Sequence, residues 1–283
     1  MFGFAAFAAA LQLIRSWRWL ALLVPYRIGY RYALQGVMLS TAANNVLPAR
    51  AGEVVRATVL SSECGVPVAS LMVTVVVERL LDLAAVAGLA LWAATWSAGR
   101  VGGEAAAWAA TAAGGLAGVT AVVMGVLVGL ALSARSGEIK WLGRLPERWQ
   151  SPVDRVLRQI SQAVLKDTPP ILLFHAALRT ALLWGVCGLW VGYGLDIVGV
   201  HVGLAGAFLT LTAVLAGISV PSAPGFVGTY HLSCMMALTW LGTDREHAVA
   251  AAVLLHGVSF LVTTAWGGLE ALRLAMRPSA SAS

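Results

Sequence analysis

Residues 44–56 read N-N-V-L-P-A-R-A-G-E-V-V-R and separate two apolar segments. The stretch brings together two amides, a proline, a glycine, a glutamate and two arginines, in a chain of 283 residues that is 59% hydrophobic. Charged and helix-breaking residues are costly at membrane depth unless protein or water surrounds them. The fold therefore has to bury this stretch against other polar groups or open it to water.

The composition is that of a membrane protein. Only 11% of the residues are charged, against about 25% in soluble domains, and the mean hydropathy is +0.81. The apolar runs are too long and too continuous for the alternating strands of a β-barrel. We therefore predict an all-α polytopic membrane protein with a single transmembrane domain over residues 1–283. The net charge of +6 favours contact with anionic lipid, and no nucleic-acid partner is expected.

Runs of apolar residues mark the helices, because a membrane-spanning helix needs about 20 of them. The first run carries Arg15 and Arg18 late and is interpreted as ending there, before Pro25. Breaks at Pro48 and at residues 221–225 divide two further regions into pairs of short segments. The predicted helices cover residues 1–24, 32–47, 52–61, 66–96, 104–132, 170–198, 203–220, 226–241 and 246–274.

The basic residues orient the chain. Residues 133–168 hold seven Lys and Arg side chains, so the positive-inside rule places this loop in the cytoplasm. Counting outward from it, the turn after the first helix, the region after Pro48 and the C-terminus lie on the same side. Within the loop, residues 151–166 have the apolar spacing of an amphipathic helix, which either lies on the inner leaflet or packs on the protein itself.

The two interrupted pairs of segments begin and end on opposite faces of the membrane in this scheme. Non-helical backbone survives at membrane depth where it is buried in protein or lines a wet cavity. Two broken segments with inverted topology, one in each half of a chain, point to a transport site near the bilayer midplane. The sequence leaves two alternatives open: re-entrant hairpins, or full spans joined by tight turns.

Charged residues follow the first break at helical spacing. Arg50, Glu53 and Arg56 lie at i, i+3 and i+6, so they share roughly one face of the short helix. The polar and helix-breaking residues beside them complete this part of the candidate site: Asn44, Asn45, Pro48 and Gly52.

A second group of charges, Glu78, Arg79 and Asp82, lies inside the next predicted span. Glu78 is about 18 Å along the helix from its start at Val66, near the centre of a hydrocarbon core about 30 Å thick. One interpretation is a polar cavity whose arginines bind an anionic group, since the planar guanidinium suits phosphate oxygens. The alternative is an interhelical ion-pair network between the two groups of charges.

The second break supplies the other half of the candidate site. A helix N-terminus at such a break presents free N–H groups that attract anions, and His231 either shuttles a proton, binds a headgroup or hydrogen-bonds a neighbouring helix. Arg179 is either a cavity charge or extends toward the membrane face, and His256 is interpreted as a packing residue. The break itself comprises Pro221, Pro224, Gly225, Gly228 and Thr229.

Three cysteines, Cys64, Cys187 and Cys234, are scattered along the chain. They form no metal-ligand spacing, and we interpret them as small apolar residues. No metal ion, cofactor or catalytic residue is expected.

Three motifs in order, N-x-x-L-P-x-R-x-G-E-x-x-R at 44–56, E-R-x-x-D at 78–82 and P-x-x-P-G-x-x-G-T at 221–229, resemble the lysylphosphatidylglycerol synthase transmembrane-region family. The resemblance implies a helical bundle that moves lipids or lipid-linked headgroups between leaflets of a bacterial plasma (inner) membrane. It departs at His231, where the family often has a glutamate, and at the first span, which is expected to be absent or truncated. The chain carries no soluble aminoacyl-transferase domain before Ser283, so synthase activity is not expected.

The leading hypothesis is a lipid flippase or transporter for an anionic or aminoacylated phospholipid, without enzymatic activity. Two alternatives stay open. One is an intramembrane lipid-phosphate hydrolase with Glu53, Glu78 and His231 as acid/base groups. The other is a non-transporting membrane partner of a separate lipid-modifying enzyme, with residues 133–168 as the docking surface.

Overall fold

The computed structural model describes residues 1–47, 51–97, 169–219 and 223–276, with a few isolated positions between 107 and 158. The predicted helix over 104–132, the basic loop 133–168 and its amphipathic helix therefore lie outside the described residues, apart from those positions. Pro48, Arg50 and Pro221 lie outside them too. Within the described ranges every regular element is a helix, which confirms the predicted all-α class.

The helix boundaries agree with the apolar runs to within a few residues. The largest differences are three residues: α3 ends three residues later than predicted, and α9 begins three residues later. There Gly225 and Gly228 have φ of 68° and 92° and interrupt the helix. The α-helices are α1 (Phe2–Leu23), α2 (Tyr30–Val46), α3 (Gly52–Cys64), α4 (Val68–Ser97), α7 (Pro170–Ile197), α8 (Gly203–Ser219), α9 (Thr229–Trp240) and α10 (Arg245–Ala275), with short 3₁₀ turns η1 (Val24–Tyr26) and η4 (Pro224–Phe226).

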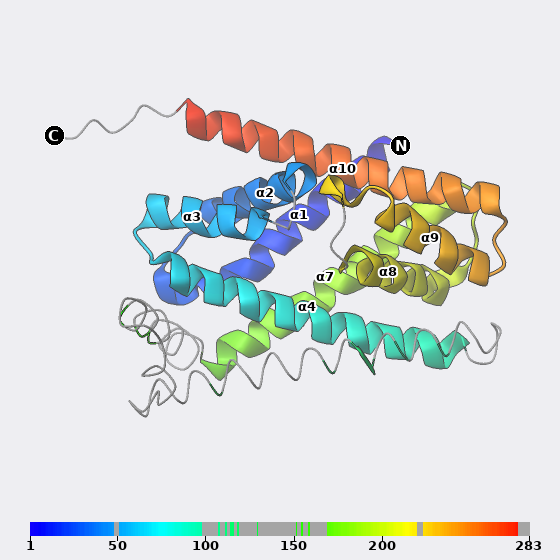
Figure 1. Ribbon diagram of the computed structural model, residues 1–283, viewed down its shortest axis with the longest axis horizontal. Helices are drawn as coiled ribbons and strands as arrows, with labels where there is room; N and C mark the ends of the chain where they lie inside the picture. Colours follow the sequence, from blue (N-terminus) through cyan, green and yellow to red (C-terminus); the bar gives the residue numbers. More distant parts are fainter. Residues whose placement is uncertain are drawn as a thin grey trace.

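Four long helices, α1, α4, α7 and α10, run along the length of the molecule (Figure 1). In the described part of the chain, three segments are long and apolar enough to cross a membrane: Phe2–Tyr26, Pro170–Ile197 and Arg245–Ala275. Helix α4 has 30 residues and is about 45 Å long, which also exceeds the membrane core. It differs from the other three because it carries three charged residues, Glu78, Arg79 and Asp82, close together.

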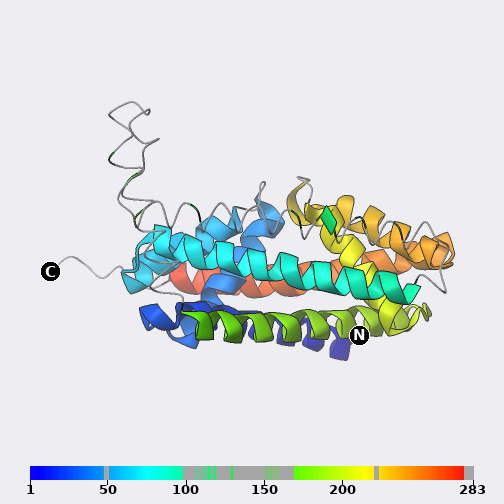
Figure 2. The same cartoon turned by 90° about the horizontal axis from the view of Figure 1, so that it is seen from below.

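The short helices form two pairs at opposite ends of the molecule (Figure 1). Helices α2 and α3 lie beside each other at one end, and α8 and α9 at the other. The two breaks approach each other, because a Cβ built on Gly225 would lie 3.1 Å from the backbone oxygen of Asn45. Figure 2 shows α1 and α7 side by side along one edge, opposite α3 and α9.

The connections group at the two ends as the orientation scheme requires. The C-terminal ends of α1, α3 and α10 lie at the same end as the N-terminal ends of α2, α4 and α7 (Figure 1). Arg27, Arg31 and Arg273 belong to this end. One end of the molecule therefore gathers the basic connecting residues, and which side of a membrane it faces stays a prediction.

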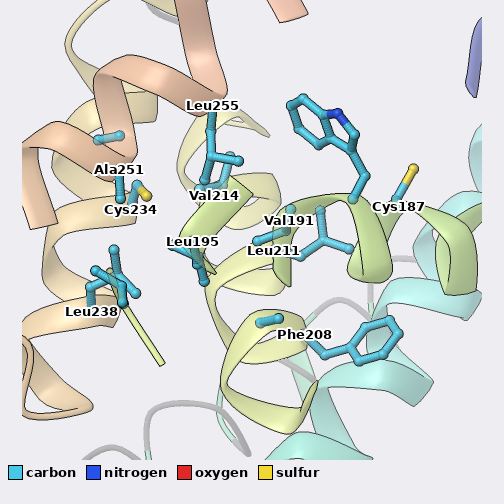
Figure 3. Packing of buried hydrophobic residues seen from close by; sticks show 14 of the residues in the cluster. Cys187, Val191, Leu195, Phe208, Leu211, Val214, Cys234, Leu238, Ala251 and Leu255 are labelled. Carbon is cyan, nitrogen blue, oxygen red and sulfur yellow. The ribbon is translucent and has the colours of Figure 1, made fainter. Parts of the chain in front are cut away.

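Two clusters of buried apolar residues hold the bundle together. One joins α1–α4, and the other joins α7–α10 to the first half of α1. Figure 3 shows the second cluster, in which Phe208 of α8 packs directly on Gly188 of α7. Cys187 and Cys234 are buried in this cluster, as interpreted from the sequence, whereas Cys64 is only partly buried.

Candidate functional site: an amphipathic cavity between the helices

A cavity of about 550 Å³ lies between the two hairpins and the long helices. One wall is polar and comes from α1–α4, and it comprises Gln12, Arg15, Arg18, Ser40, Thr41, Asn44, Asn45, Glu53, Arg56, Arg79 and Asp82. Another part of the lining is apolar and includes Leu183, Val191, Leu211, Val214, Leu215 and Ile218 of α7 and α8. The cavity can therefore accommodate a molecule with a polar and an apolar part.

Buried ion pairs join three helices beside this cavity. Arg18 of α1 pairs with both Glu78 and Asp82 of α4. Arg56 of α3 lies 3.0 Å from the second carboxylate oxygen of Glu78. Because Arg18, Arg56 and Glu78 are almost completely buried, these pairs connect α1, α3 and α4 in a medium of low polarity, where an unpaired charge is costly.

A second set of contacts extends the network toward the cavity. Arg79 lies 3.2 Å from Glu53 of α3 and 3.2 Å from Asp82, one turn along its own helix. The indole nitrogen of Trp184 donates a hydrogen bond of 2.9 Å to Asp82. The side chain of Arg79 is 41% exposed, so this part of the network contacts the cavity while the Glu78 part is sealed.

The network supports the ion-pair interpretation of these charges, and it includes one residue that was not predicted. The interhelical ion pair between Arg56 and Glu78 was one of the two interpretations of these charges. The structure adds Arg18, which the sequence pattern places at the basic end of the first span and outside the candidate site. Spacing along a helix shows which residues share a face, but it does not show which helix that face meets.

The guanidinium of Arg56 also lies 4.4 Å above the centre of the Trp19 ring. The indole nitrogen of Trp19 donates a hydrogen bond of 3.0 Å to Thr74 of α4. Arg56 is 1% exposed and is thus enclosed by a carboxylate and an aromatic face. Its position argues for a structural role, in contrast to the predicted contact with a ligand.

The end of the first hairpin is built from the two asparagines. Asn44 accepts a hydrogen bond of 2.8 Å from the Gly52 N–H and donates one of 3.2 Å to Glu53. Asn45 donates to Thr263 and Thr264 of α10 at 2.9 and 2.8 Å. These amides therefore cap α3 and attach α2 to α10.

Gly52 allows the close approach of α2 and α3. A Cβ at this position would lie 2.0 Å from the backbone oxygen of Ser40 and 2.6 Å from the side-chain oxygen of Asn44. Only glycine fits between them, which gives a physical reason for the glycine of the first motif.

The second break is attached to α10 by a histidine. Nε2 of His256 donates a hydrogen bond of 2.8 Å to the backbone oxygen of Gly225, which is buried in a left-handed conformation. The His256 ring stacks on Tyr230 of α9 at 4.7 Å, and both rings line the cavity. The interpretation of His256 as a packing residue was therefore incomplete, because the sequence does not show that α10 passes the broken backbone.

The predicted residues of this break form a turn beside the cavity. His231 accepts a hydrogen bond of 3.4 Å from the Gly228 N–H and contacts the His256 ring at 4.7 Å. Thr229 donates to the backbone oxygen of Phe226 at 3.2 Å, and Pro224 is exposed. The cavity-lining residues here are Phe226 and Tyr230. The predicted residues thus determine the backbone conformation of the break, whereas the adjacent residues Phe226 and Tyr230 line the cavity.

Arg179 lies outside the cavity, which corrects its placement in the candidate site. It is partly buried and donates a hydrogen bond of 2.8 Å to the backbone oxygen of Trp17. Its guanidinium lies 4.1 Å above the Trp17 ring. A long side chain on α7 can reach around α1, and periodicity along α7 alone does not reveal this.

Arg15 lines the cavity and has no ion-pair partner within the described part of the chain. Neither Arg15 nor Gln12 was assigned to the site from the sequence, since both lie in the first apolar run. The other site residues were assigned because they lie in or beside the polar motifs, and Arg15 and Gln12 are far from those motifs in the sequence. Among the described residues, no group of three or more His, Cys, Asp or Glu side chains is placed to hold a metal ion.

Long apolar helices, charges buried between them and an amphipathic internal cavity define a multi-pass helical membrane protein. The chain belongs to the lysylphosphatidylglycerol synthase TM region family, whose model matches residues 1–267, and this confirms the resemblance seen in the motifs.

One curated relative is "Glycosyltransferase AglD" from Haloferax volcanii. It is 29% identical over 276 aligned residues that cover 85% of this chain and 43% of the relative. The chain thus spans less than half the length of this relative. No solved structure matches the chain.

Proposed function

We propose that this protein moves an anionic or aminoacylated phospholipid between the two leaflets of the membrane. The observation that carries the proposal is the cavity, which joins a charged wall from α1–α4 to an apolar wall from α7 and α8. A lipid crossing the membrane has to shield its headgroup from hydrocarbon, because a charge there costs several kcal/mol, roughly 3 or more. A polar wall supplies that shield, and an apolar wall accommodates the acyl chains.

The lengths of the short helices support a re-entrant arrangement of both hairpins. Helices α2, α3, α8 and α9 have 17, 13, 17 and 12 residues. At about 1.5 Å per residue they extend about 18–26 Å, less than a hydrocarbon core of about 30 Å. Broken helices of inverted topology that meet near the midplane are the usual setting of a transport site. We propose that the two breaks alternately open the cavity to each face.

The grouping of basic residues supports an orientation for this transport. We propose that the end with Arg27, Arg31 and Arg273 faces the cytoplasm of a bacterial cell, following the positive-inside rule. The C-terminus would then be cytoplasmic, and the α2–α3 hairpin would enter from the cytoplasmic leaflet. The α8–α9 hairpin would enter from the outer leaflet.

The test is lipid movement in liposomes that contain the purified protein and a fluorescent lipid with an anionic headgroup. Loss of fluorescence after an external quencher is added reports how fast the inner lipid reaches the outer leaflet. We expect Val214→Trp, which fills the apolar wall, to slow the movement at least about tenfold. Val253→Trp on the exposed face of α10, where Val253 is 55% exposed, is the matched control and should behave as wild type.

Two results would overturn the proposal. One is wild-type protein that moves no fluorescent phospholipid faster than empty liposomes do. The other is equal transport by the Val214 and Val253 variants. Folding of each variant is checked by its elution from a sizing column.

A membrane partner of a separate lipid-modifying enzyme is the second candidate. It is motivated by the curated relative, which is named a glycosyltransferase. The same liposome assay separates the two candidates, because a docking subunit moves no lipid alone.

A further inference from the structure

The charges around the cavity do not balance among the described residues. Three arginines, Arg18, Arg56 and Arg79, are paired with three carboxylates, Glu53, Glu78 and Asp82. A fourth arginine, Arg15, lines the same cavity without a carboxylate partner in the described ranges. Among the described residues, the wall therefore carries one excess positive charge, and that charge is on Arg15.

The paired arginines are poorly placed to receive a ligand. Arg79 is 41% exposed, but its guanidinium already lies 3.2 Å from both Glu53 and Asp82. Arg18 and Arg56 are 2% and 1% exposed. The Nε and Nη2 groups of Arg56 have no hydrogen-bond partner but are buried, so a ligand could not reach them unless Trp19 moved. Arg15 is only partly buried, and its guanidinium is open to the cavity.

A second unpartnered group lies one turn from Arg15 on the same face of α1. Gln12 is 5% exposed, lines the cavity, and its side-chain oxygen has no hydrogen-bond partner. Residues three apart on a helix are neighbours, with Cβ atoms about 5–6 Å apart. The pair presents a cationic donor beside a free acceptor, which matches a phosphate next to a hydroxyl or amine.

Helix α1 also places this pair at the boundary between the two walls. Ala8 and Leu11 precede it and contribute to the apolar lining, while Arg18 follows it and joins the ion pairs. Ala8 and Arg18 are about 15 Å apart along the helix axis. A lipid phosphate lies at the junction of headgroup and glycerol, so the boundary is the expected position for its binding group.

We propose that Arg15 is the residue that binds the phosphate of a phosphodiester lipid in this cavity, with Gln12 accepting a hydrogen bond from the headgroup. The proposal rests on the proposed function, which has the cavity accommodate a lipid. A phosphodiester carries one negative charge, which equals the excess positive charge of the wall. Arg18, Arg56 and Arg79 then hold the helices, and Arg15 selects the ligand.

The experiment measures equilibrium binding of a radiolabelled phosphatidylglycerol with two eight-carbon chains to the full chain in detergent. We expect Arg15→Gln to weaken binding at least about tenfold, because it removes a charge-assisted hydrogen bond. Arg15→Lys keeps the charge and should recover part of the loss. Gln12→Leu is an independent variant expected to weaken binding about threefold. Arg179→Gln, outside the cavity, is the matched control and should bind as wild type.

Two unlabelled competitors identify the chemistry that is recognised. Dioctanoylglycerol has the chains without the phosphate, and glycerophosphoglycerol has the phosphate headgroup without the chains. Each should compete at least about tenfold less well than the complete lipid.

Specific outcomes would overturn the assignment. Wild-type affinity in Arg15→Gln contradicts the role of Arg15, and equal competition by dioctanoylglycerol contradicts phosphate recognition. Equal competition by glycerophosphoglycerol contradicts a lipid ligand. If the lipid binds in an Arg15-dependent way but does not move between leaflets in liposomes, the proposed function alone is overturned. If the lipid binds and moves equally well in wild type and Arg15→Gln, this inference alone is overturned.

Discussion

The two broken hairpins reach the same cavity but are held by different forces. The α2–α3 hairpin is attached by ion pairs from Glu53 and Arg56 to α4 and by amide hydrogen bonds from Asn45 to α10. The α8–α9 hairpin packs through apolar residues, and its break is attached to α10 by the bond from His256. Directional, charged contacts favour one fixed arrangement, whereas apolar packing tolerates sliding. We therefore expect the second hairpin to move more easily than the first.

The largest effect should follow from removing the carboxylate at the centre of the network. Glu78→Gln leaves Arg56 buried without its carboxylate and Arg18 with only one. We expect the free energy of unfolding to fall by about 3–5 kcal/mol, because an uncompensated buried charge is costly. Reversible unfolding of the purified protein in mixed detergent and denaturant measures the change.

The matched control for this variant is Arg79→Gln. Arg79 belongs to the same network, but its side chain is 41% exposed, so water can replace its partners. Its loss should be about 1 kcal/mol or less. Equal losses in the two variants would contradict the division of the network into a sealed and an open part.

An intermediate effect is expected at the glycine that brings α2 and α3 together. Gly52→Ala places a Cβ against the backbone oxygen of Ser40, and backbone cannot rotate away as a side chain can. The helices must separate, at a cost of about 1–3 kcal/mol. Thermal unfolding monitored by circular dichroism measures the loss.

Gly88→Ala on α4 tests whether the loss comes from crowding. Gly88 has open space around its Cβ position, so alanine should leave the stability unchanged or raise it by up to about 1 kcal/mol. If Gly52→Ala and Gly88→Ala both lower the unfolding temperature, crowding at Gly52 is not the cause of the loss.

The smallest effect is expected at the second hairpin. His256→Phe keeps an aromatic ring beside Tyr230 but removes the donor to the Gly225 oxygen. The loss of stability should be about 1 kcal/mol. Amide hydrogen exchange should become faster in residues 223–228 and stay unchanged in α2 and α3.

His175→Phe on α7 is the control, because His175 is exposed and its ring lies beside that of the neighbouring Phe174. Unchanged exchange around Gly225 in the His256 variant would show that apolar packing alone holds this break.

Much of the helical pattern follows from the amino-acid sequence alone. Apolar runs located the described helices to within a few residues, and Pro48 and residues 221–225 indicated both breaks. Of the two interpretations of the charge spacing, the ion-pair alternative is the one that the Arg56–Glu78 pair supports. These predictions succeed because helix length, helix breaking and the burial of charge are governed by local composition.

The members of the site were harder to predict. Arg15, Arg18 and His256 were missed, and Arg179, one of whose two interpretations was a cavity charge, does not line the cavity. Each error concerns a residue whose role depends on contact with a helix far away in the chain. Arg18 and Asp82 are 64 residues apart, and His256 and Gly225 are 31 apart. Periodicity shows which residues share a helix face, and it contains no information on the partner of that face.

The sequence by itself thus determined a helical membrane protein with two broken segments and a costly set of charges. Those features follow from the free energy of placing each residue type in hydrocarbon, which depends on the residue and its neighbours in the chain. Only the tertiary structure decided that Arg18, Arg56 and Arg79 are paired while Arg15 faces the cavity without a carboxylate partner in the described ranges. Pairing depends on distances between helices, and packing of the whole bundle sets those distances.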